Sequence, residues 1–156
     1  MVPGRDQQAS PREIAIGFLA RREYSRAELE GRLARKGVEP DVIADCLDEL
    51  AEQGLQSDER FAESYARERV LRGQGERRIR SELFQRGVDT DTQRQALASV
   101  VEQEDVDWFE LARAVLARRF STPGDTPKER ARRERFLASR GFEFDQIHHA
   151  LTALSE

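Results

Sequence analysis

The 156-residue sequence predicts an all-α protein in which three tandem three-helix repeats form an elongated, curved, solenoid-like array. Three observations support this prediction. One helix ending occurs three times, as RLARKGV at 32–38, ELFQRGV at 82–88 and FLASRGF at 136–142. Helix-start signals recur between these endings, and no stretch shows the sustained alternation of a half-buried strand. The apolar fraction of 38% is low for one thick core and suits a thin, extended one.

Three helix starts have the sequence form of a capping box, at residues 10–13, 25–28 and 126–129. In each, a serine or threonine hydroxyl can accept a hydrogen bond from an N–H of the first turn. The glutamate three positions later can reach back to the N–H of the cap residue. In two of them proline takes the first helical position, where its missing N–H does no harm.

The three endings are interpreted as helix C-caps at Gly37, Gly87 and Gly141, each preceded by a basic residue. Glycine accepts the left-handed backbone conformation that closes a helix, and a cation suits the negative end of the helix dipole. The glycines are 50 residues apart (87 − 37) and then 54 (141 − 87), and the loop STPGDT at 121–126 is expected to hold the extra length. Leucine stands four residues before each glycine, at 33, 83 and 137, and ten residues after it, at 47, 97 and 151.

These starts and stops predict nine helices, at residues 11–22, 26–36, 40–53, 58–72, 76–86, 91–103, 106–120, 127–140 and 144–154. Grouped in threes, the helices predict repeats at 11–54, 55–104 and 105–156, after a flexible N-terminus at 1–10. The repeated ending is then the C-cap of the middle helix of each repeat. Neighbouring repeats are expected to stack, because three short helices bury little surface alone.

The apolar residues of each repeat are expected to form its core, and the aromatic residues among them are interpreted as packing residues. In the first repeat these are Ile14, Phe18, Leu19, Leu29, Leu33, Val42, Ile43, Cys46, Leu47 and Leu50. In the second they are Phe61, Tyr65, Ile79, Leu83, Leu97 and Val100. In the third they are Trp108, Leu111, Val115, Leu116, Phe136, Leu137, Ile147, Leu151 and Leu154.

Charge is unevenly distributed along the chain, although the formal net charge is only −4. Residues 39–63 hold nine acidic side chains and one basic side chain, whereas residues 67–86 hold seven arginines and three glutamates. All 26 basic residues except Lys36 and Lys128 are arginine, whose planar fork pairs with carboxylates and phosphates. The cluster around GQGERRIRSEL at 73–83 is interpreted as a binding surface for DNA phosphates or an acidic protein. The alternative is a solvated face with intrahelical ion pairs, such as Glu76 with Arg80.

The candidate partner-binding residues are cations on or near the predicted middle helices. They are Arg35, Lys36, Arg67, Arg72, Arg77, Arg78, Arg80, Arg132 and Arg133.

No catalytic, cofactor or metal site is expected. His148 and His149 are adjacent, so on a helix they point about 100° apart and cannot face one ligand together. Cys46 is the single cysteine, so a Cys/His zinc set is excluded, and its place in an apolar pattern indicates a buried thiol. No GxxxxGK[ST] loop occurs, and the segment at 73–75 is too short for a dinucleotide loop.

A cytoplasmic location is expected from three features. No apolar run is long enough to span a membrane. The N-terminus has no apolar core of a signal peptide. With one cysteine the chain cannot form an internal disulfide, which agrees with a reducing compartment.

The stretch GLQSDERFAESYARERVLRGQGERRIRSELFQRGV at 54–88 resembles the signature region of RecX regulatory proteins. REYSRAELEGRLARKGV at 22–38 and RFLASRGFEFDQIHHAL at 135–151 resemble the flanking parts of that family. The resemblance runs from residue 12 to 154, and order, spacing and internal repeat all agree. The departure is the arginine-rich segment KERARRE at 128–134, which leaves open which repeat contributes most to binding.

The resemblance implies a bacterial cytoplasmic protein that binds the RecA recombinase filament on single-stranded DNA. Members of this family lodge in the filament groove and limit filament growth and RecA's ATPase, strand-exchange and co-protease activities. They thereby modulate DNA repair, recombination and the SOS response, and some members also bind DNA. Two alternatives remain, a helical DNA-binding module and a repeat scaffold for another protein. The net charge of −4 predicts only weak direct contact with DNA.

Overall fold

The computed structural model describes residues 9–155, and every regular element within that range is an α-helix, which confirms the all-α prediction. The helices are α2 (Pro11–Leu19), α3 (Arg26–Arg35), α4 (Pro40–Glu52), α5 (Asp58–Leu71), α6 (Glu76–Gln85), α7 (Thr90–Gln103), α8 (Trp108–Arg119), α9 (Pro127–Ser139) and α10 (Phe144–Leu154). Most of the N-terminal segment expected to be flexible, 1–10, lies outside the described residues. The repeat limits at 54 and 104 stay a prediction.

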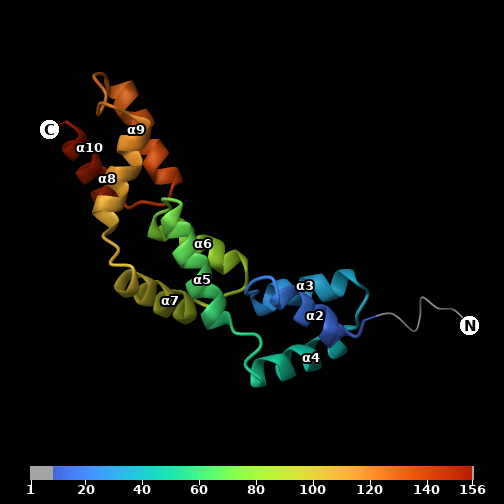
Figure 1. The fold of residues 1–156 in the computed structure, drawn as a ribbon. Coiled ribbons are helices and arrows are strands. Elements are labelled where there is room, and N and C mark those ends of the chain that lie inside the picture. The colour runs from blue at the N-terminus through green and yellow to red at the C-terminus, as the bar shows by residue number, and fades with distance from the viewer. Residues whose placement is uncertain (1–8, 156) are drawn as a thin grey trace, which may run out of the picture.

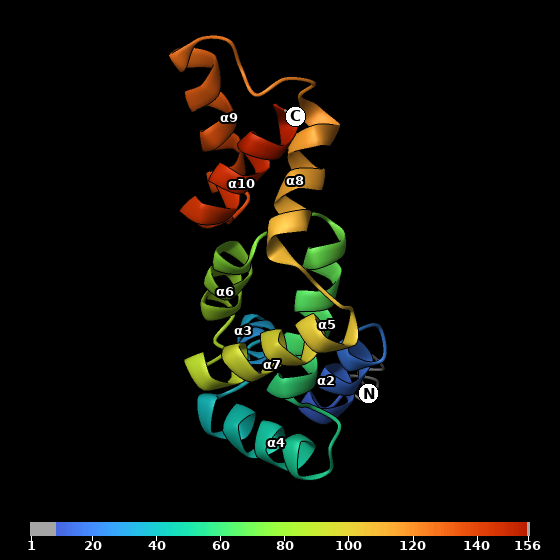
Figure 2. The same cartoon turned by 90° about the vertical axis from the view of Figure 1, so that its left-hand side faces the viewer.

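The helices form three successive trios that follow a curved, elongated path, as the sequence predicts (Figure 1). The middle helix of each trio, α3, α6 or α9, lies on the inner side of the arc. The third helix, α4, α7 or α10, lies on the outer side, and the view in Figure 2 looks onto α7 and α10. The inner side is therefore built by the three helices that share the repeated ending.

Each trio has its own small hydrophobic core. The first contains Leu29, Leu33 and Leu47, the second Phe61, Ile79 and Leu83, and the third Leu116, Leu137 and Phe142, with further residues around each group. The leucines four residues before the repeated glycines are fully buried. Within residues 9–155 the three cores are separate, so the repeats do not stack through one continuous apolar core.

Two core assignments from the sequence are wrong. Val42 is 48% exposed, because the buried residues of α4, from Ile43 to Leu50, occupy its other face. Trp108 packs against the second core instead of the third. It is the first residue of α8, where the chain has just left α7, so its ring reaches back to the preceding repeat.

Several helix ends differ from the prediction. The α2 helix ends at Leu19 instead of residue 22, because a turn closed on the carbonyl of Phe18 brings Tyr24 and Ser25 into buried positions. Of the three expected capping boxes, only the one at Ser25 has both hydrogen bonds. Ser10 and Thr126 cap their helices with one bond each, since the carboxylates of Glu13 and Glu129 bind other groups.

The first and second repeats meet where α3 begins and α6 ends, and we call this contact the first joint. The hydroxyl of Ser25 donates to the carbonyl oxygen of Arg86 over 2.8 Å. The N–H of Arg26 donates to a carboxylate oxygen of Asp58, also over 2.8 Å. A Cβ added at Gly87 would collide with the side chain of Ala27. The joint is thus a close, polar contact between helix ends.

The second and third repeats meet in the same way, where α6 begins and α9 ends, at the second joint. The N–H of Gly75 donates to the carbonyl of Arg140 over 2.7 Å, and the N–H of Arg77 donates to the carbonyl of Gly141 over 3.1 Å. Gly141 has φ of 98°, and a Cβ there would lie 2.5 Å from the backbone nitrogen of Arg78. The α6 helix has no side-chain cap, so the next repeat supplies its capping acceptors.

Candidate partner-binding face

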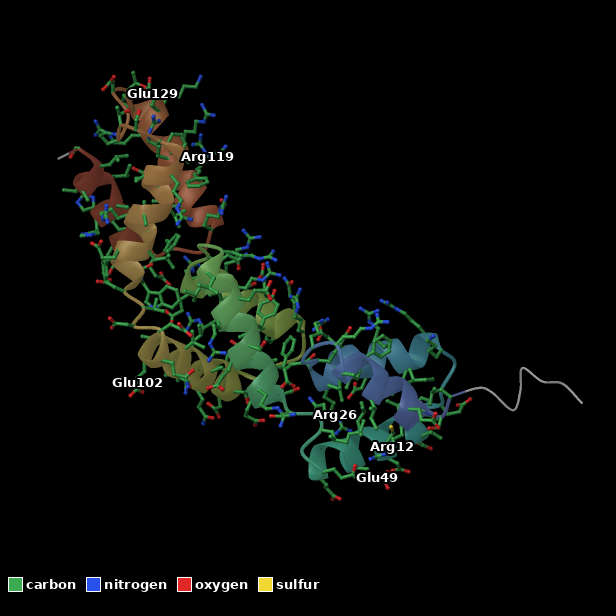
Figure 3. The ribbon with its side chains drawn as sticks, viewed as in Figure 1. Arg12, Arg26, Glu49, Glu102, Arg119 and Glu129 are labelled. Atoms are coloured by element: carbon green, nitrogen blue, oxygen red, sulfur yellow. The ribbon has the colours of Figure 1, made fainter. Side chains whose placement is uncertain are left out.

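Side-chain nitrogen atoms gather along the inner side of the arc, beside the middle helices (Figure 3). Glu49 on α4 and Glu102 on α7 point away from this side, toward the outer edge of their repeats. The exposed cations of the middle helices among the predicted residues are Arg35, Lys36, Arg77, Arg80 and Arg132, and we call this set the inner face. The alternation of acidic and basic blocks in the sequence thus becomes a difference between two sides of the molecule.

The arginines on and next to α6 fall into two groups, those bonded to Glu82 and those with weak or no contacts to the rest of the described chain. Arg78 lies 3.1 Å from Glu82, one turn later, and Arg86 donates to the carbonyl of Glu82 over 3.1 Å. Arg77 is 65% exposed, and its one ion-pair contact within the described residues is with Glu143, at 3.8 Å. Arg80 forms no ion pair within residues 9–155, so the pair with Glu76 named under the alternative interpretation is absent there. Arg77 and Arg80 therefore remain available to a partner.

Glu82, a partly buried residue of α6, determines which of these arginines are paired. The hydroxyl of Tyr65 donates to its carboxylate over 2.7 Å, and Arg69 approaches the same oxygen to 3.7 Å. Burial by itself would raise the pKa of Glu82, but the hydrogen bonds from Tyr65 and Arg78 and the charge of Arg69 outweigh it, so the pKa lies below its ordinary value. Burial, and then the bond to Glu82, raise the pKa of Tyr65. The carboxylate stays ionised and keeps its arginines in place.

Two of the predicted residues are held by neighbouring groups. Arg67 donates to Glu104 over 3.0 Å and also binds Gln103, at the end of α7 on the outer side. Arg133 donates to the carbonyls of Thr122 and Glu129 and lies over the ring of Phe120, where it fixes the loop before α9. We therefore leave both out of the proposed contact surface.

Sequence reasoning missed a group of arginines from two repeats. Arg118 and Arg119 at the end of α8 and Arg140 at the end of α9 meet Arg72 of the preceding repeat around a cavity of about 240 Å³. The tripeptide RRF at 118–120 is the signal in the sequence for this group, but it lies outside the predicted middle helices. The convergence with Arg72 depends on the second joint.

The other side chains that could take part in catalysis or metal binding are buried, paired or directed away from one another. Cys46 is buried as expected, and burial raises the pKa of its thiol. His149 lies 3.7 Å from Glu110, whereas the ring of His148 stacks on Phe144, so the two imidazoles diverge as the sequence predicts. Among the described residues no group of three or more His, Cys, Asp or Glu could hold a metal ion. Nor does any helix there combine the length and apolarity that crossing a membrane requires.

The fold and this face define a class of protein, a curved array of three-helix repeats with a basic inner side. Family models described as the first, second and third three-helix domains of RecX match residues 12–50, 57–97 and 105–151. The three matches follow the order of the three trios. The chain belongs to the RecX family, which confirms the resemblance seen in the sequence.

Relatives and solved structures agree with this membership. The chain is 57% identical to a "Regulatory protein RecX" of Chromohalobacter salexigens, over 93% of each chain. It is 45% identical to one of Halorhodospira halophila, over 93% of this chain and 88% of that one. The crystal structure of RecX from Lactobacillus salivarius superposes with a TM-score of 0.72 and 25% identity, covering 92% and 94% of the two chains. A second RecX crystal structure has the same fold, with a TM-score of 0.78.

Proposed function

We propose that this protein binds the RecA recombinase filament on single-stranded DNA in the bacterial cytoplasm and restrains it. Binding limits filament growth and the recombinase's ATPase, strand-exchange and co-protease activities. Membership of a family of regulatory proteins along almost the whole chain supports this proposal. The observation that carries the mechanism is the gathering of side-chain nitrogens along the inner side of the arc, beside the middle helices of three successive repeats.

The mechanism that we propose rests on multiple weak contacts. A helical filament repeats the same surface, so a curved rod with a basic helix in each repeat can touch several subunits together. Each contact by itself is weak, but linked contacts raise the apparent affinity for the filament above that for a free subunit. Arginine suits this role because its fork pairs with carboxylates and phosphates alike. The chain itself needs no catalytic group, since the recombinase hydrolyses the ATP.

The test is a charge reversal on α6. The double variant Arg77→Glu, Arg80→Glu should weaken inhibition of RecA ATPase on single-stranded DNA by about tenfold or more, because buried or semi-buried contacts to these cations would become repulsive. The measurement is ATPase rate against inhibitor concentration, with circular dichroism to verify that the helices persist. The matched control, Arg94→Glu with Arg113→Glu, makes the same change in charge on α7 and α8, beside Asp91 and Glu110. Equal inhibition by the wild type and the α6 variant would refute this placement of the site.

A direct DNA-binding module is the competing function, since the same cations could contact phosphates. It predicts strong binding to a DNA strand without recombinase, with an affinity that falls steeply as salt rises. Fluorescence anisotropy with a labelled oligonucleotide at several salt concentrations distinguishes the two functions. If loss of inhibition follows loss of DNA affinity across the variants, the DNA-binding module is correct.

A further inference from the structure

The cavity at the second joint brings together cations of two repeats. It lies between the end of α5, the last turns of α8 and the end of α9, and has a volume of about 240 Å³. Arg72, Arg118, Arg119 and Arg140 line it, together with Val115 and Phe136. Among the residues that the structure describes, no acidic side chain lines it. We call this site the joint pocket.

The charges of the joint pocket are not balanced by the protein. Arg72 pairs with Glu68 over 3.0 Å, one turn back on its own helix. The other three arginines of the pocket form no ion pair with any residue in the described range 9–155. Like charges that converge without a counter-charge repel one another, and a bound anion relieves that repulsion. The pocket therefore has an excess of about three positive charges.

Two of the guanidinium groups are held in place before any ligand arrives. The guanidinium carbon of Arg119 lies 5.1 Å from the ring centroid of Phe136, and that of Arg140 lies 4.9 Å from it. Phe136 in turn packs edge-to-face on Phe120, with 5.7 Å between the ring centroids. Cation–π contacts of this kind restrict long side chains, so less conformational entropy is lost when an anion binds.

We propose that the joint pocket binds phosphate groups that carry two or three negative charges in total. The fork of arginine matches phosphate oxygens in pairs, and several arginines around one cavity suit a group with several charges. A single carboxylate would neutralise only one of three cations. Val115 and Phe136 add an apolar wall on which a base or sugar can rest. Two sources have this chemistry, the diphosphate of a free nucleotide and successive phosphates of a nucleic-acid strand.

The test uses the full chain without recombinase, so its result is independent of the proposed function. Binding of inorganic pyrophosphate and of a short labelled oligothymidylate is measured at low salt, by calorimetry and by fluorescence anisotropy. We expect Arg119→Gln with Arg140→Gln to weaken pocket binding by about tenfold or more, since each arginine contact is charge-assisted. The control, Lys128→Gln with Arg135→Gln, removes two charges from α9 outside the pocket and should change affinity by about twofold or less.

A second variant distinguishes a loss of ligand binding from a loss of folding. Arg118→Gln removes a lining cation that does not lie on Phe136, so it should weaken binding while thermal unfolding stays unchanged. Pocket-dependent binding of pyrophosphate identifies a nucleotide-like ligand, whereas pocket-dependent binding of the oligothymidylate alone identifies a strand. Equal losses in the pocket and control variants would overturn the proposal, as would absence of binding by the wild type. Pocket-dependent binding of a glutamate-rich peptide in place of either phosphate ligand would also overturn it.

Discussion

Among single residues, Glu82 decides which cations of the second repeat face a partner. Its carboxylate accepts hydrogen bonds from Tyr65 and Arg78 and lies near Arg69. Arg77 and Arg80 do not contact it and stay exposed to solvent on the inner face. In the sequence these arginines look alike. The i, i+4 rule identifies the pair of Arg78 with Glu82, but it favours Glu76 with Arg80 more, because there the acid precedes the base. The position of Tyr65, from another helix, favours the pair of Arg78 with Glu82 instead.

The lowered pKa of Glu82 predicts how acid affects stability. A carboxyl group whose pKa is lower in the folded than in the unfolded chain, where it is about 4.3, contributes stability above that value. The contribution disappears as pH falls through the folded pKa. Glu82→Gln should therefore be less stable than the wild type at pH 7, and the difference should shrink as pH falls below the unfolded-state pKa of about 4.3. Urea unfolding at several pH values measures this.

The control for the acid experiment is Glu102→Gln, on the outer side of α7. Its carboxylate forms no ion pair or side-chain hydrogen bond within the described part of the chain, so the substitution should leave stability nearly unchanged at every pH. A difference between wild type and Glu82→Gln that stays constant down to pH 3 would contradict the assignment of the lowered pKa.

At the level of helices, the three middle helices follow one another end to end. The carbonyls at the end of α9 accept from the first N–H groups of α6, and the last carbonyl of α6 accepts from Ser25 at the start of α3. Negative and positive helix ends therefore meet at both joints. The sequence showed that each glycine closes a helix, but not that Gly87 and Gly141 also touch the neighbouring repeat. An added Cβ at Gly37 would have no atom of the described residues within 4 Å.

Substitution of these glycines by alanine separates their role in closing a helix from their role in the contact with the neighbouring repeat. Gly37→Ala should cost roughly 1–2 kcal/mol, the cost of the left-handed conformation at its φ of 85°. Gly141→Ala should cost a further 1–3 kcal/mol or so, because its Cβ would collide with Arg78. Thermal or urea unfolding compares the two variants. Equal losses would show that the second joint can open without cost to the fold.

As a whole molecule, the protein is a chain of three small cores linked by polar helix ends and, between the second and third repeats, also by Trp108. This arrangement follows from its composition, because 38% apolar residues fill three thin cores better than one thick core. It also explains the shape, since each joint is a contact between helix termini and not between helix sides. The third helices stay on the outer side, and the inner side remains open to a partner (Figures 1 and 3).

The shape has a direct test in solution. A compact globule of 156 residues has a radius of gyration of about 15 Å. The curved array should exceed that value clearly in small-angle X-ray scattering, and its distance distribution should have a long tail. A radius of gyration near 15 Å would mean that the repeats collapse onto one another and hide the inner face.

The sequence by itself determined the helices, their grouping in threes, most of the core and the family. These features depend on local signals, such as caps, glycines and the spacing of leucines, which act within a few turns of the chain. The tertiary structure alone decided that Trp108 serves the second core, that Arg67 and Arg133 are occupied, and that Arg72 meets Arg119 and Arg140. These outcomes depend on packing between segments: Arg67 reaches the end of α7, and Arg133 reaches the loop before α9. The contacts of Trp108 and Arg72 cross the boundary between the second and third repeats, which caps, glycines and leucine spacing do not specify.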